Sequence, residues 1–208
     1  MKNTRFRILP IIACAAVAAI SMPSVVAQAY KVQLEKPQFE DFPSPEIGGG
    51  KSKSFKPKDW LEIEAGFTVQ MAPAPPSQTA DRILVKWYVA VENPDKPGTY
   101  LLLTKDITHV NVPLNEEVFT SVYLSPASVR RITGTDRAGK RSVYSVGLEV
   151  LVNGEKVAQE STKLDAGWWN AASPKISRSD TVPLLDKSES AFADMWWDRY
   201  AEILQERR

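Results

Sequence analysis

Apolar residues alternate with polar residues or glycine throughout the segment from Leu61 to Met71, and this period of two constrains the fold most. Because successive side chains of a strand point to opposite faces, such a run predicts a strand with one buried and one solvated face. The same alternation recurs at residues 83–91 and 144–152. The chain is therefore predicted to be mainly β.

Turn chemistry separates these strands from several others. Residues 93–98 are rich in proline and glycine, and Asn153-Gly154 is a strong hairpin signal because both turn positions need positive φ. About seven short strands predict an immunoglobulin-like antiparallel β-sandwich over residues 59–180, with Trp87 as its core tryptophan. The other strand-like segments are residues 100–103, 107–112, 118–124 and 156–163, and residues 164–179 read as a loop.

Two helices are predicted. Ser125 and Gly134 bracket a short one, with a serine cap, a proline at the first helical position and a glycine past the end. Residues 181–208 are predicted to contain an amphipathic α-helix, opened by a capping box at Asp186 and packed on the sandwich or on a partner. Its apolar stripe, which would place Trp196 in the core, consists of Phe192, Met195, Trp196, Tyr200, Ile203 and Leu204.

The N-terminus has the organisation of a secretory signal peptide over residues 1–29. Basic residues precede a short apolar run, and the small residues Ala27 and Ala29 form the cleavage site. The protein is therefore expected to be exported, to the periplasm or to the outer membrane and cell surface. Residues 30–58 hold several prolines and a glycine triplet and are predicted to be a flexible arm. In an alternative interpretation, Phe39 and Phe42 of this arm dock on a partner.

Composition excludes several functions. Removing the three basic leader residues leaves 23 basic and 25 acidic residues, a formal charge of −2, which argues against nucleic acid as a partner. The single cysteine, Cys14, leaves with the leader, so the mature chain has neither a disulfide nor thiol chemistry. His109 is the only histidine, which excludes sites that need two. No cofactor and no metal site are expected.

No residue pattern predicts catalysis, and the protein is not expected to be an enzyme. Glycoside hydrolysis needs two carboxylates that face one pocket. Glu62 and Glu64 lie two apart on the predicted wet face of one strand, and residues 116–117 lie in a turn, so a solvated face is the simpler interpretation. The glycine-flanked serine of hydrolases is absent, and His109 has no serine partner in a nucleophile context.

Two groups of residues are candidates for binding. Trp168 and Trp169 follow a glycine in a loop, where they would either stack on sugar rings or plug the end of the sandwich; Trp197 lies off the apolar stripe and is the better candidate for an exposed contact. A basic segment suits carboxylates, phosphates or acidic glycans, although a solvated loop is the simpler interpretation. Its arginines are Arg130, Arg131, Arg137 and Arg141.

The chain resembles a small family of exported, pilus-like proteins of verrucomicrobial gut bacteria, which are encoded with type IV pilus assembly components. The resemblance rests on the leader, the strands at residues 59–67 and 86–88, the Gly167–Asn170 loop and the segment Met195–Tyr200. It implies an immunoglobulin-like fold, an envelope location and a part in pilus assembly or surface interaction, and it supplies no catalytic residues.

Three hypotheses remain open from the sequence. The first is a non-enzymatic envelope module that contacts pilus assembly or other envelope proteins and that self-associates through the C-terminal helix or a free sheet edge. The second is a glycan-binding or adhesin-type module that uses the loop aromatics or the arginines. The third is an enzyme, which a cleft with a paired, buried carboxylate would favour.

Overall fold

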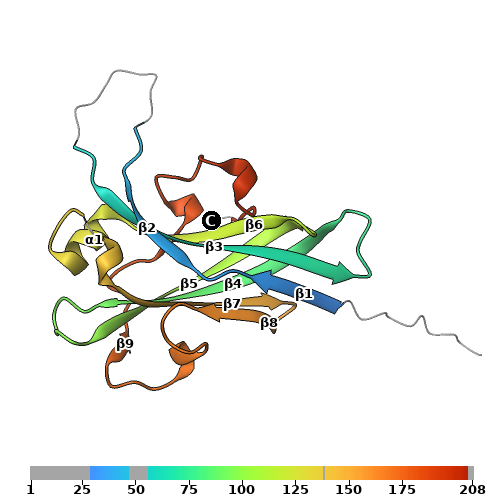
Figure 1. Ribbon diagram of the computed structural model, residues 1–208. Coiled ribbons are helices and arrows are strands. Elements are labelled where there is room, and N and C mark those ends of the chain that lie inside the picture. The colour runs from blue at the N-terminus through green and yellow to red at the C-terminus, as the bar shows by residue number, and fades with distance from the viewer. Residues whose placement is uncertain (1–28, 47–55, 138, 206–208) are drawn as a thin grey trace, which may run out of the picture.

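Two β-sheets packed face to face form the body of the protein, as Figure 1 shows. The computed structural model describes residues 29–46, 56–137 and 139–205. The predicted signal peptide up to residue 28, with Ala27, lies outside the described residues, and Ala29 is the first residue of β1. The prediction of a mainly β protein with a sandwich architecture is confirmed.

The first sheet is built around β3 (Asp59–Ala72), the strand with the strongest alternation in the sequence. β6 (Glu117–Leu124) pairs with one edge of β3, and β10 (Leu185–Asp186) pairs with β6. β1 (Ala29–Leu34) and β2 (Gln38–Pro43) pair with the other edge of β3, and all four of these pairings are antiparallel. The register places Tyr123 opposite Glu62 on the outer face of this sheet.

The prediction of a flexible arm over residues 30–58 is wrong for its first part. β1 and β2 together form one interrupted edge strand along β3, broken at residues 35–37, where Pro37 cannot donate to the ladder. Alternate side chains of this strand, including Val32 and Phe39, pack against the core. Sheet pairing thus offsets the ordering entropy that the segment could not offset alone. Residues 47–55 of the predicted arm lie outside the described residues.

The second sheet has the order β8, β7, β4, β5 and β9. β4 (Thr79–Glu92) lies at its centre and pairs antiparallel with β5 (Tyr100–Pro113) and β7 (Val143–Val152). β5 is a single strand where the sequence predicts two. The predicted loop at residues 164–179 contains the 3-10 helix η2 (Trp168–Asn170) and the short strand β9 (Ile176–Arg178), which runs parallel to β5. β7 and β8 (Glu155–Ser161) form the hairpin predicted at Asn153-Gly154, whose φ angles are 52° and 83°.

The inward residues of both sheets form one continuous core. Trp87 is fully buried there, as predicted, and its indole Nε1 donates to the Thr120 hydroxyl at 3.4 Å. The predicted short helix is also confirmed as α1 (Pro126–Thr133), with Ser125 as its N-cap and Gly134 in the left-handed conformation at its end. The 3-10 helix η1 (Gly139–Ser142) follows α1 at the same end of the sandwich.

The predicted C-terminal α-helix is wrong over the described part of residues 181–208. The capping box of Asp186 and Glu189 is present, but it caps only the 3-10 turn η3 (Lys187–Glu189). Beyond η3 the chain is irregular apart from the 3-10 turn η4 (Trp197–Arg199), and it runs along the outside of β6 (Figure 1). Within the described residues, no helix has the length and apolarity needed to cross a membrane.

Candidate interaction surface

The C-terminal segment, residues 187–205, closes the side of the sandwich between the two sheets. Its backbone bonds to an edge of each sheet: Ala201 donates to the Phe119 carbonyl of β6 at 3.0 Å, and Leu204 donates to the Thr108 carbonyl of β5 at 2.8 Å. Val110 of β5 in turn donates to the Glu202 carbonyl at 3.0 Å. These bonds satisfy backbone N–H and C=O groups at the sheet edges, which an α-helix in this place would have left unpaired. The segment is therefore an extended seam.

His109 fixes this seam from inside the core. It lies on β5 with only 1% of its surface exposed. Its Nε2 lies 2.9 Å from the Thr120 hydroxyl of β6, and its Nδ1 lies 3.1 Å from the carbonyl oxygen of Ala201. Burial lowers the pKa of His109 to about 4, against the opposing effect of the backbone carbonyls, so the ring is neutral at physiological pH. The only histidine is thus a structural residue that joins both sheets and the seam.

The expectation that Glu62 and Glu64 lie on a solvated face is wrong for Glu62, which is 7% exposed. The Tyr123 hydroxyl donates to Glu62 at 2.5 Å, and the Tyr200 hydroxyl lies 3.2 Å from Glu62 and 2.9 Å from Glu64. Arg199 donates to Glu64 at 2.6 Å. Burial raises the pKa of the Glu62 carboxyl, the Tyr123 hydroxyl lowers it, and Glu64 raises it further. The two carboxylates are therefore anchors for the C-terminal segment.

Replacing Tyr200 with phenylalanine is expected to loosen this anchor. The variant loses the hydroxyl contacts to both carboxylates, which should cost about 1–2 kcal/mol of unfolding free energy. Limited proteolysis should cut the C-terminal segment of Tyr200→Phe faster than that of the wild type, while urea unfolding measures the stability change.

Tyr144→Phe is the matched control. Its ring stacks on Tyr100, and among the described residues its hydroxyl has no hydrogen bond. Equal stability and equal protease sensitivity of Tyr200→Phe and Tyr144→Phe would contradict the anchoring role of Tyr200.

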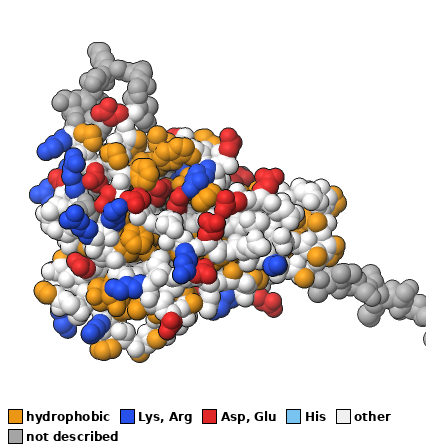
Figure 2. Space-filling model, in the orientation of Figure 1, with side chains coloured by type: hydrophobic (Ala, Val, Ile, Leu, Met, Phe, Trp, Pro, Cys, Tyr) orange, Lys and Arg blue, Asp and Glu red, His pale blue; other side chains and the backbone are white. Residues whose placement is uncertain are grey.

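Aromatic rings from three parts of the chain meet beneath the C-terminal segment. Phe192 stacks on Tyr123 with ring centroids 5.3 Å apart and contacts Trp60 edge-on at 5.8 Å. Trp196 stacks on Phe192 at 6.1 Å and contacts Phe42 of β2 at 6.4 Å. One interpretation of the arm predicted that Phe42 docks on a partner. In the structure Phe42 packs within its own chain. Figure 2 shows hydrophobic side chains gathered on the part of the surface that lies over β6 and the C-terminal segment.

Trp196 and Trp197 are exposed at the edge of this cluster. Trp197 is 70% exposed, as expected, whereas Trp196 is 47% exposed rather than buried in the core. Trp196 also adopts a left-handed backbone conformation with φ of 53°, which is costly for a bulky residue and occurs preferentially at functional sites. Large exposed tryptophans are frequent at the energetic centres of protein interfaces. This pair is the strongest candidate contact on the molecule.

Two grooves flank residues 203–205. The first, of about 660 Å³, is lined by polar residues that include Lys105 and Glu189. The second, of about 550 Å³, has Trp197 and Glu202 in its wall. Glu62 and Glu64 line neither groove. Within the part of the chain that the structure describes, no group of three or more histidine, cysteine or acidic side chains could hold a metal.

The tryptophan loop has a different role from the exposed pair. Trp169 is 7% exposed and its ring is parallel to that of Tyr88, with centroids 4.8 Å apart. It covers Gly147 on the outer face of the second sheet. Trp168 is half-buried, and its Nε1 donates to Ser161 at 3.1 Å. By the criterion of exposure, the loop favours a structural role over stacking on sugars.

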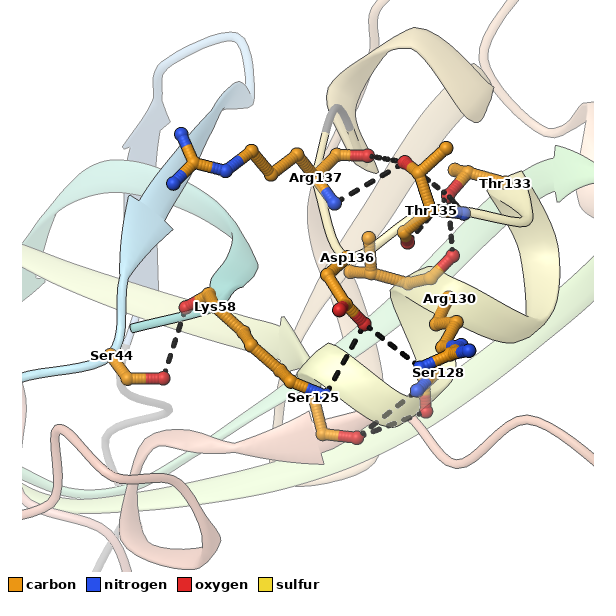
Figure 3. A network of polar contacts seen from close by, with 10 residues as sticks. Ser44, Lys58, Ser125, Ser128, Arg130, Thr133, Thr135, Asp136 and Arg137 are labelled. Atoms are coloured by element: carbon orange, nitrogen blue, oxygen red, sulfur yellow. Dashed lines mark hydrogen bonds and ion pairs between the residues drawn. The ribbon is translucent and has the colours of Figure 1, made fainter. Parts of the chain in front are cut away.

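The arginines of the basic segment gather at the end of the sandwich that carries α1, where Figure 2 shows several Lys and Arg side chains. Asp136 neutralises part of this end through Lys58 at 3.3 Å and Arg130 at 3.6 Å. Figure 3 shows the guanidinium of Arg137 extending away from this network, while its backbone carbonyl accepts from Thr135. Arg131, Arg137 and Arg141 are exposed. The structure thus brings the predicted arginines together.

The exposed tryptophan pair and the arginine-rich end lie on a two-sheet scaffold that other proteins share. A family model matches residues 23–207, which is most of the chain. A crystal structure of a protein from Akkermansia muciniphila is 39% identical and superposes with a TM-score of 0.80. The match covers 86% of this chain and 96% of that one. The chain belongs to the pilus-like family. Among curated proteins, none matches it.

Membership in the pilus-like family agrees with the resemblance carried by the sequence, and the matched structure comes from a verrucomicrobial gut bacterium. The sequence offered Trp197 and the arginines as candidates, and the structure shows Trp197, Arg131, Arg137 and Arg141 exposed. The sequence did not reveal the anchor formed by Glu62, Tyr123 and Tyr200. A signal for the anchor exists. Phe119 and Tyr123 both lie on the predicted outer face of β6. Two large aromatic side chains on one face indicate that another segment of the chain packs against it.

Proposed function

We propose that this protein is an exported, non-enzymatic component of the cell envelope that acts with type IV pilus assembly proteins through protein–protein contacts. The single observation that carries this proposal is the exposed pair Trp196 and Trp197, which lies on a segment whose backbone bonds to both sheets. Interfaces concentrate their binding energy in such aromatic residues. The pilus-like family and the secretory leader support the envelope location.

The sandwich is proposed to be immunoglobulin-like, with β1 and β2 as a split edge strand. Two-sheet sandwiches of this kind serve as binding scaffolds in many proteins, because the strands position surface segments rigidly. The paired carboxylates do not argue for an enzyme. Glu62 is 7% exposed, and Tyr200 and Arg199 occupy the two carboxylates through hydrogen bonds and an ion pair.

Trp197→Ala is expected to abolish most of the contact with envelope proteins. The side chain is 70% exposed, so the variant should keep the melting temperature of the wild type while losing at least about tenfold in affinity. The measurement is a pull-down of the tagged mature chain from its own cell envelope after cross-linking, with captured pilus assembly proteins quantified by mass spectrometry.

Trp168→Ala serves as the comparison, because it removes the half-buried tryptophan of the other loop. Wild-type capture by Trp168→Ala, with loss in Trp197→Ala, supports the proposal. If the wild type captures no pilus assembly protein but retains mucin-type glycans, and Trp168→Ala loses that retention, the glycan-binding hypothesis replaces it.

A further inference from the structure

The C-terminal surface carries an excess of negative charge around its exposed aromatic pair. We define this surface by Trp196, Trp197, Asp194, Asp198 and Glu202, all of which are exposed. In the described part of the chain, none of the three acidic residues takes part in an ion pair. The Arg199 guanidinium is bound to Glu64 and stacked on the ring of Phe119. The Lys187 ammonium, whose charged form Asp194 favours, is buried and donates to the carbonyls of Phe192 and Ala193.

The opposite charge is found at the arginine end, which we define by Arg131, Arg137 and Arg141. Asp136 is occupied by Lys58 and Arg130, and Glu40 is occupied by Lys140. Across residues 29–46, 56–137 and 139–205, no ion pair is found for the three arginines of this end. Each presents a free guanidinium, whose planar fork matches a carboxylate.

The two surfaces lie on different parts of one molecule. The arginine end lies around α1, whereas the C-terminal surface lies over the outer face of the first sheet (Figure 1). We infer that the C-terminal surface of one copy binds the arginine end of a second copy. This inference rests on the proposed function, because it names the second copy as one protein partner of the same tryptophan pair.

The chemistry of the contact follows from the groups involved. Three carboxylates and three guanidinium groups can pair across the interface, and a guanidinium also stacks on the face of an exposed tryptophan. Tryptophan and arginine are the residues most enriched where interface energy concentrates. Because each copy uses two different surfaces, the contact is heterologous and leaves one surface free at each end of a pair. Association then proceeds to a closed ring or an open chain.

The test is sedimentation velocity of the mature chain over a range of concentrations, at about 50 mM and about 500 mM NaCl. The wild type should associate at low salt and shift toward monomer at high salt, since the Debye length falls as salt rises. Two triple variants reverse one surface each. The first is Arg131→Glu, Arg137→Glu, Arg141→Glu, and the second is Asp194→Lys, Asp198→Lys, Glu202→Lys. Each alone should weaken self-association at least about tenfold.

Mixing the two triple variants provides the decisive measurement. The mixture regains complementary surfaces and should form complexes that neither variant forms alone, a result that misfolding cannot produce. A wild type that is monomeric at both salt concentrations, or association that neither reversal weakens, would overturn the inference. If a monomeric wild type still captures pilus assembly proteins, the inference fails and the proposed function stands. If the wild type self-associates as expected but captures no pilus assembly protein, the proposed function fails and the self-association stands.

Discussion

Acidification from pH 6.5 to pH 4 is expected to cost the protein about 3 kcal/mol of unfolding free energy through His109 alone. The pKa of this buried histidine is lowered to about 4, whereas the unfolded chain has the ordinary value of 6.5. Between these two values the unfolded chain binds a proton that the folded chain does not. Stability therefore falls as the pH falls through this window, and at pH values well above 6.5 the residue contributes no pH dependence.

The pKa is lowered because the buried seam does not solvate a charged imidazole. His109 lies between the Thr120 hydroxyl and the Ala201 carbonyl, and its ring contacts Phe67 with centroids 5.9 Å apart. Burial penalises the charged ring more than the carbonyl oxygens of Ala201 and Glu202 favour it. Protonation at low pH should accordingly release the C-terminal segment before the rest of the sandwich unfolds.

Urea unfolding at pH 4.5 and pH 7.5, for the wild type and for His109→Gln, checks this expectation. The glutamine does not titrate, so the variant should lose less stability than the wild type between these pH values. Glu62 acts in the opposite direction, because its raised pKa favours the folded state as the pH falls. Its effect is common to both proteins and cancels in the comparison. Identical pH dependence of the two would show that His109 is not the sensitive group.

Gly147→Ala is expected to destabilise the protein by about 2–3 kcal/mol. Gly147 lies on the outer face of β7, and a Cβ placed there would overlap the indole ring of Trp169. The ring would have to leave its position, which exposes a buried tryptophan and breaks its stacking on Tyr88. The glycine is thus required by the close approach of a side chain.

Gly66→Ala is the matched control, since Gly66 also lies in the middle of a strand on an outer face. Its closest neighbours would be the carboxylate oxygens of Glu35 and Glu117, each at 3.0 Å, which are flexible ends that can move aside. This variant should therefore change stability much less than Gly147→Ala. Urea unfolding gives the free energies, and near-ultraviolet circular dichroism follows the environment of Trp169.

A double variant provides a second check on the cause. Removing the indole in Trp169→Ala should make the added methyl group of Gly147→Ala almost neutral, so the two effects should not add. Additive losses, or an unchanged tryptophan spectrum in Gly147→Ala, would mean that the ring does not cover this glycine in solution.

Much of the sandwich follows from local sequence. The period of two in β3, β4 and β7 identified the buried faces, and Asn153-Gly154 fixed the hairpin through its positive φ angles. The cap at Ser125 and the left-handed Gly134 likewise defined α1. In each case the signal and the structure that it specifies lie within a few residues of one another. Such features need no knowledge of distant partners.

The wrong predictions of a flexible arm and of a C-terminal helix concern segments whose partners are distant in the sequence. β1 and β2 have little order of their own and become strands because the edge of β3 supplies their hydrogen bonds. The candidate site shows the same dependence. Trp197 was recognised from its local position, but the pairing of Tyr200 with Glu62 joins residues 138 positions apart.

The C-terminal segment separates what the sequence determined from what only the tertiary structure decided. By itself, the sequence determined the strand pattern, the hairpin turn and the short helix, because these depend on neighbouring residues. Its apolar spacing equally suited a helix, and only the tertiary structure decided against one. The edges of β5 and β6 offered backbone partners at residues 201–204, and Tyr123 and Trp60 offered Phe192 a buried place. Those long-range contacts outweighed the local preference for a helix.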